Sequence, residues 1–94
     1  PTGTHVLACE AGKVELAGWN DGLGKCIIIS HGGGLKTVYG HLSKINVTKG
    51  QAVVRGQFIG EVGSTGNSTG PHLHLGVMVN GSYVDPQKGW LSIP

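Results

Sequence analysis

The sequence predicts an all-β fold of short, mostly antiparallel strands with little helix. Glycine supplies 18 of the 94 residues, well above the average of about 7%. Each glycine inside a helix costs about 1 kcal/mol relative to alanine. Short runs rich in valine, isoleucine and leucine recur between the glycines, as is typical of strands separated by turns. The glycines follow no Gly-X-Y period, which excludes collagen, and the apolar runs argue against disorder.

The first half of the chain reads as a run at residues 5–8 followed by a meander of three strands. The meander strands are expected at residues 13–17, 25–31 and 35–41. Glycines punctuate the sequence between them, most densely at residues 32–34, where a tight turn is expected. Consecutive strands joined by such short loops pair antiparallel.

The second half continues the same pattern as far as its last residues. Asn80-Gly81 between two β-runs favours a two-residue type I′ hairpin turn, in which both residues need positive φ. Asp85 and Pro86 could cap and begin a short terminal helix. The strands are expected at residues 52–55, 58–62, 72–79 and 82–85.

Charge and cysteine content exclude several classes of protein. Seven basic and five acidic residues give a net charge of +2, and no basic stripe with interleaved aromatics points to nucleic-acid binding. No apolar run approaches the roughly 18 residues of a membrane span. The two cysteines, Cys9 and Cys26, could form a disulfide in an exported domain or stay reduced, because pairing geometry cannot be read from sequence. They do not form a C-x-x-C pair, which excludes a zinc ribbon.

Two of the five histidines share one face of a predicted strand. His72 and His74 alternate with Leu73 and Leu75, and alternate residues of a strand project to the same side. Two adjacent imidazoles are costly to bury unpaired. They suit metal binding or proton transfer, and the alternative is a pair of solvated histidines on an edge strand. A catalytic zinc would need three protein ligands and a water.

The remaining polar residues give weaker signals. His41 ends the third meander strand, where site residues are common, but a structural role is equally open. His31 stands at the turn of residues 32–34, where hydrogen bonding to the turn is expected. Residues 63–71 form a polar loop that could close over a peptide substrate or be an ordinary surface turn. No Gly-x-Ser-x-Gly elbow occurs, and Glu61, on an expected exposed strand face, gives little support to a paired-carboxylate glycosidase.

Several of these stretches, taken together and in order, resemble the lysostaphin/LytM-type peptidoglycan zinc metalloendopeptidases. The most informative are Tyr-Gly-His-Leu at residues 39–42 and Gly-Pro-His-Leu-His at residues 70–74. The resemblance covers residues 3–8, 12–14, 29–43, 47–50, 54–60 and 63–74, then Asn80-Gly81 and Asp85-Pro86.

The resemblance implies a fold, a reaction and roles for three histidines. The fold would be a glycine-rich, mostly antiparallel sheet architecture of the duplicated hybrid motif type. One Zn²⁺ would be bound by a His-x-x-x-Asp pair and by His74, with His41 and His72 as the catalytic histidines. The reaction would be hydrolysis of a peptide bond in the peptides of bacterial peptidoglycan. The implied location is extracytoplasmic, as a secreted, periplasmic or wall-associated bacterial enzyme or a phage lysin.

One part of the family pattern is missing from this sequence. No His-x-x-x-Asp occurs in residues 1–94, and relatives usually carry it just ahead of the stretch that residues 1–6 match. We therefore expect a single LytM-type domain that is truncated at its N-terminus, binds zinc weakly and is inactive as this fragment. His5 matches a position where relatives often have proline, so it is not assigned as a ligand.

Two other hypotheses about the function remain open from the sequence alone. The first is a degenerate, non-catalytic relative that binds the cell wall or partner proteins and regulates other hydrolases or envelope assembly. The second is a biotinyl or lipoyl carrier domain, suggested by the turn-strand pattern of residues 47–60, but neither Lys44 nor Lys49 has the expected Met-Lys or Asp-Lys setting.

Overall fold

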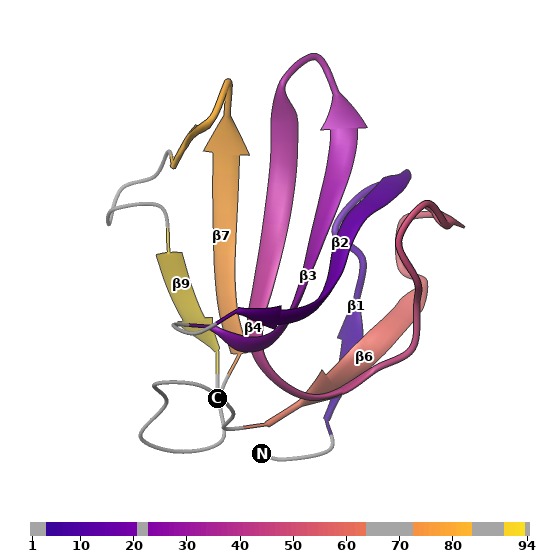
Figure 1. Ribbon diagram of the computed structural model, residues 1–94, viewed down its shortest axis with the longest axis vertical. Coiled ribbons are helices and arrows are strands. Elements are labelled where there is room, and N and C mark those ends of the chain that lie inside the picture. Colours follow the sequence, from indigo (N-terminus) through magenta and orange to yellow (C-terminus); the bar gives the residue numbers. More distant parts are fainter. Residues whose placement is uncertain (1–3, 21–22, 64–72, 84–89, 94) are drawn as a thin grey trace.

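The protein folds as a single curled, antiparallel sheet (Figure 1). A computed structural model describes residues 4–20, 23–63, 73–83 and 90–93. The strand order is β1-β6-β4-β3-β2-β5, and β7 pairs with β4, β8 and β9. The all-β prediction is therefore confirmed. The strands are β1 (His5–Leu7), β2 (Gly12–Asn20), β3 (Gly24–Gly32), β4 (Leu35–Ile45), β5 (Ala52–Val53), β6 (Phe58–Val62), β7 (Leu73–Val79), β8 (Ser82–Tyr83) and β9 (Trp90–Ile93).

The predicted meander and the predicted hairpin are both present. Strands β2, β3 and β4 pair antiparallel in sequence order, and β7 pairs with β8 across Asn80 and Gly81. Asn80 and Gly81 have φ values of 52° and 85°, as a type I′ turn requires. The Asn80 amide also donates to the Gly34 carbonyl over 2.9 Å, which joins this turn to the β3–β4 turn.

The end of the chain contains a strand that the sequence pattern did not indicate. Strand β9 pairs with β7 along Leu73–Gly76, so β7 lies between β4 and β9 (Figure 1). The predicted helix start at Asp85 and Pro86 lies outside the described residues. In the described part of the chain, no helix is long and apolar enough to cross a membrane.

The core is a cluster of buried, mostly aliphatic side chains from several strands of the curled sheet and the segments that join them. The cluster contains Val6, Ala8, Val14, Ile27, Ile29, Tyr39, Leu42, Val47, Val53, Ile59 and Val62.

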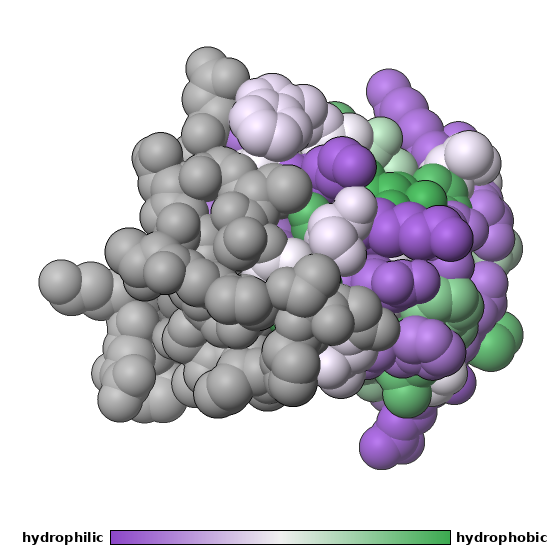
Figure 2. Space-filling model, turned by 90° about the horizontal axis from the view of Figure 1, so that it is seen from below, coloured by the Kyte–Doolittle hydropathy of each residue, from purple (hydrophilic) through white to green (hydrophobic). Residues whose placement is uncertain are grey.

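Two backbone hydrogen bonds join the β1–β2 connection to the β5–β6 turn. The Gly56 amide donates to the Ala8 carbonyl and the Ala8 amide donates to the Gln57 carbonyl, both over 2.9 Å. Seen from the end where β6 finishes and β7 begins, the described surface mixes hydrophilic and hydrophobic side chains (Figure 2).

A chain of polar groups crosses this core and links three segments. The Tyr39 hydroxyl accepts from the Cys9 amide at 3.0 Å and lies 2.9 Å from Thr37 Oγ1. His31 Nε2 is 2.8 Å from the same Thr37 oxygen, and His31 Nδ1 is 2.7 Å from the Ala11 carbonyl. A carbonyl only accepts, so Nδ1 carries the proton. His31 therefore has a structural role, but its partners are Ala11 and Thr37 and not the adjacent turn.

Stability should fall at high pH because of Tyr39. Burial raises its pKa to about 12, against about 10 in an unfolded chain. The neutral phenol is thus favoured in the folded state, and its stabilisation is complete below pH 10 and lost as pH rises from 10 to 12. We expect the stability advantage of the native chain over Tyr39→Phe to shrink across that interval in urea titrations. An advantage that stays constant up to pH 12 would contradict this account.

The two cysteines are free thiols in this structure. Cys26 is fully buried in β3, and this burial raises the pKa of its thiol. Cys9 is exposed in the connection between β1 and β2, where its amide bonds Tyr39. The sequence left open whether Cys9 and Cys26 form a disulfide or stay reduced, and in this structure both are reduced.

Candidate active site

Strand β4 changes its partner at His41. Along one edge, β4 pairs with β7 from Leu35 to Gly40 and with β6 from Leu42 to Ile45. His41 stands between these two registers. The opposite edge of β4 pairs with β3 as far as Leu42. Strands β6 and β7 therefore diverge at His41, with the last residue of β6, Val62, opposite Leu42 and His74 of β7 opposite Gly40.

The backbone of His41 is held in an unusual conformation by bonds on both sides. Its φ is 59°, a left-handed value that few residues other than glycine adopt. Its amide donates to the Leu23 carbonyl over 2.6 Å, and its carbonyl accepts from the Gly63 amide over 3.0 Å. Only 2% of its surface is exposed. Such backbone strain costs roughly 1–3 kcal/mol and is concentrated at functional sites.

Gly40 allows the β2–β3 loop to pack onto the strand beside His41. A Cβ at Gly40 would lie 3.0 Å from Leu23 Cδ2, so a larger residue would push Leu23 away. The loop itself is fixed by the Leu23 amide, which donates to Asn20 Oδ1 over 3.1 Å. The glycine in Tyr-Gly-His-Leu thus lets Leu23 approach closely enough for its carbonyl to hold the His41 amide.

The structure brings His41 and His74 to neighbouring positions. His74 lies on β7 opposite Gly40, the residue immediately before His41. His72 lies outside the described residues, so its predicted partnership with His74 and His41 stays a prediction. Among the described residues, no group of three His, Cys, Asp or Glu side chains is arranged to hold a metal ion.

The start of the described chain meets this same end of the sheet. The Thr4 carbonyl accepts from the Val62 amide over 2.8 Å, and the next residue, Gly63, donates to His41. Ser43 Oγ, two residues beyond His41, donates to the Val62 carbonyl over 3.0 Å. Thr4 therefore lies next to the part of the sheet that holds His41, although the two residues are far apart in sequence.

Sequence reasoning missed two residues that shape this site. Leu23 and Gly63 hold the amide and the carbonyl of His41, but Leu23 belongs to a glycine-containing connection that reads as an ordinary loop, and the loop that begins at Gly63 was considered only for contact with a substrate or as a surface turn. The available signal was Gly40, since glycine inside a strand often marks a place where another segment approaches closely.

Comparisons with known proteins agree on one family. A family model described as peptidase family M23 matches residues 1–86. Peptidoglycan DD-endopeptidase ShyA of Vibrio cholerae is 46% identical over 88 residues, which is 94% of this chain and 20% of that protein. Lysostaphin of Staphylococcus staphylolyticus is 51% identical over 80 residues, which is 83% of this chain and 17% of that protein.

The structural comparison supports the same assignment. A solved structure described as a zinc containing peptidase from Vibrio cholerae matches with a TM-score of 0.87 at 42% identity, over 100% of this chain and 28% of that one. The resemblance to lysostaphin-type enzymes is therefore confirmed. The chain spans about a fifth of the length of the curated relatives it matches.

Proposed function

Because the chain belongs to peptidase family M23, we propose that it forms most of a zinc endopeptidase domain that hydrolyses peptide bonds in bacterial peptidoglycan. His74 is the zinc ligand, and His41 and His72 are the catalytic histidines. The observation that carries the proposal is the position of His41. Its side chain is buried and its backbone has a left-handed φ. The preceding residue, Gly40, pairs with His74 of β7. The proposal places the domain outside the cytoplasm, because its substrate is there.

The donor chemistry fits a zinc site to which this chain contributes one ligand. Imidazole nitrogen is among the ligands that zinc prefers, and a catalytic site needs three protein ligands. The other two would come from a His-x-x-x-Asp segment. Such a segment placed ahead of Pro1 would run toward Thr4, whose carbonyl bonds Val62 beside Gly63 and His41. The position of Thr4 beside Gly63 and His41 supports a zinc site shared between such a segment and His74.

In this proposal, the metal and the histidine side chains have separate roles in catalysis. When bound, zinc polarises the scissile carbonyl and lowers the pKa of water. His41, whose main chain is fixed at both its amide and its carbonyl, would supply its imidazole for proton transfer. His72 would share in that transfer and in stabilising negative charge on the substrate oxygen.

The test uses this chain with a His-x-x-x-Asp segment joined ahead of Pro1. We expect it to release soluble fragments from purified peptidoglycan, with mass spectra showing new amino and carboxyl termini and intact glycan bonds. The chain without the segment should release nothing. If the joined chain binds one zinc per molecule and still cleaves no peptide bond, the non-catalytic reading is correct.

A further inference from the structure

The connection between β2 and β3 reaches His41 through two hydrogen bonds of one residue, Leu23. The Leu23 amide donates to Oδ1 of Asn20 over 3.1 Å, and the Leu23 carbonyl accepts from the His41 amide over 2.6 Å. Asn20 is the last residue of β2, and Leu23 directly precedes Gly24, the first residue of β3. The Asn20 side chain is therefore linked to the proposed catalytic histidine through a single intervening residue.

The conformation of His41 depends on where the Leu23 carbonyl lies. A left-handed φ of 59° is unfavourable for a histidine and persists only where the surrounding structure fixes it. The bond from the His41 amide to Leu23 is shorter than the usual N–H···O distance of about 2.9 Å, and His41 is buried. Moving the Leu23 carbonyl away would take this acceptor from a buried amide, which is costly.

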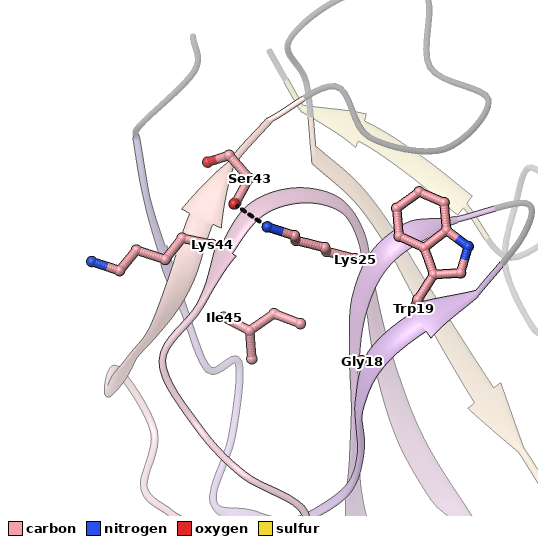
Figure 3. Close-up of a pocket in the computed structure, with 6 residues that line it drawn as sticks. All are labelled: Gly18, Trp19, Lys25, Ser43, Lys44 and Ile45. Atoms are coloured by element: carbon pink, nitrogen blue, oxygen red, sulfur yellow. Dashed lines mark hydrogen bonds between the residues drawn. The ribbon is translucent and has the colours of Figure 1, made fainter.

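Three sets of contacts hold Leu23 in place. Its side chain packs over Gly40, where a Cβ would lie 3.0 Å from Leu23 Cδ2. On the β3 side, Lys25 Nζ donates to the Ser43 carbonyl over 3.1 Å, which fixes the start of β3 to β4 (Figure 3). On the β2 side, Oδ1 of Asn20 accepts from the Leu23 amide. The first two contacts restrict where Leu23 lies, and the bond to Asn20 fixes the orientation of its main chain.

An asparagine at the end of β2 suits this task. The side-chain oxygen of asparagine readily replaces a main-chain acceptor in a turn. Asn20 pairs with Gly24 across the β2–β3 ladder, so the connection closes tightly and Oδ1 reaches the Leu23 amide three residues later. Asn20 is exposed, so a substitution there removes the bond with little loss of core packing.

We propose that Asn20 is a positioning residue for His41. By holding the Leu23 amide, its side-chain oxygen keeps the Leu23 carbonyl on the His41 amide and keeps His41 in its left-handed conformation. The consequence for catalysis rests on the proposed function, whereas the effect on the His41 main chain is a property of the fold. A residue that only closed the β2–β3 turn would leave the His41 amide bond unchanged.

The first test measures the His41 bond itself in the 94-residue chain. The readout is the NMR scalar coupling across the hydrogen bond between the His41 nitrogen and the Leu23 carbonyl carbon. Asn20→Leu and Asn20→Ala both lack an acceptor and should reduce this coupling by about half or more, because hydrogen bonds weaken steeply with distance and misalignment. Asn20→Asp keeps an acceptor oxygen and should restore it. The coupling from Asn46 to Ile59, whose main-chain bond is 2.8 Å long, should stay constant throughout.

The second test measures cleavage by the chain joined to a His-x-x-x-Asp segment. Asn20→Leu should lower kcat about tenfold or more with little change in KM, because a misplaced catalytic group impairs the chemical step. Asn20→Asp should recover most of the rate, and zinc content should be equal in all variants. Asn46→Leu makes the same change at an exposed residue of the β4–β5 connection and should cleave normally.

The outcomes separate this inference from the proposed function. An unchanged His41–Leu23 coupling in Asn20→Leu and Asn20→Ala would overturn the inference, even if both variants were less stable. A lost coupling that Asn20→Asp does not restore, or a lost coupling with an unchanged kcat, would also overturn it. If the joined chain without substitutions cleaves nothing, the proposed function fails, and the coupling still decides whether Asn20 positions His41.

Discussion

His41→Asn is expected to lower peptidoglycan cleavage by about 100- to 10,000-fold, the range typical for removal of a general acid or base. Asparagine tolerates the left-handed backbone better than most residues, so it suits the φ of 59° at this position. The amide and carbonyl bonds to Leu23 and Gly63 involve only the main chain and should persist. The measurement is the initial rate of release from purified peptidoglycan by the chain joined to a His-x-x-x-Asp segment.

The matched control makes the same chemical change outside the site. His5 is exposed on β1, and its ring lies 4.2 Å from that of Phe58. His5→Asn should therefore cleave at close to the unsubstituted rate. Zinc content should be equal in both variants, since neither histidine is a proposed ligand. If His41→Asn keeps more than a tenth of the rate, His41 is not catalytic.

Gly63→Ala is expected to destabilise the fold by about 3 kcal/mol, within the range for overpacking against atoms that cannot move aside. A Cβ at this position would lie 2.6 Å from Ser43 Cβ and 2.7 Å from Ser43 Cα. Relief requires β4 and β6 to separate at the point where Gly63 bonds the His41 carbonyl. The change should therefore reduce both stability and cleavage, measured by urea unfolding and by release from peptidoglycan.

A second glycine gives the control for Gly63→Ala. At Gly18, a Cβ would meet nothing within 4 Å, so Gly18→Ala should leave stability unchanged or raise it by up to about 1 kcal/mol, since alanine restricts the unfolded chain. Equal effects of the two substitutions would show that the close approach of Gly63 to Ser43 does not govern stability.

The regular part of the fold could be predicted because the local sequence specifies it. Strand alternation and the glycine turns were sufficient for the β2–β3–β4 meander, and Asn80-Gly81 was sufficient for the hairpin, since its turn type depends on two residues alone. Strand β9 was missed because a short strand at residues 90–93 is defined by its pairing with β7, and such long-range pairing leaves little local signal.

The candidate site was only partly predictable for the same reason. The resemblance pointed to His41 and His74, and the β4–β7 register places them at neighbouring positions. The left-handed backbone of His41 could not be foreseen, because it results from a change of strand partner and from contacts with Leu23 and Gly63, which are distant in sequence.

The most direct test of the account is zinc stoichiometry in the chain joined to a His-x-x-x-Asp segment, with and without His74→Ala. We predict one tightly bound zinc per chain with His74 present, and at least a tenfold weaker affinity without it. His5→Ala, which removes a histidine outside the site, should bind zinc as tightly as the unsubstituted chain. Equal zinc affinity with and without His74 would contradict the assignment of His74 on β7 as a zinc ligand, and with it the proposed active site.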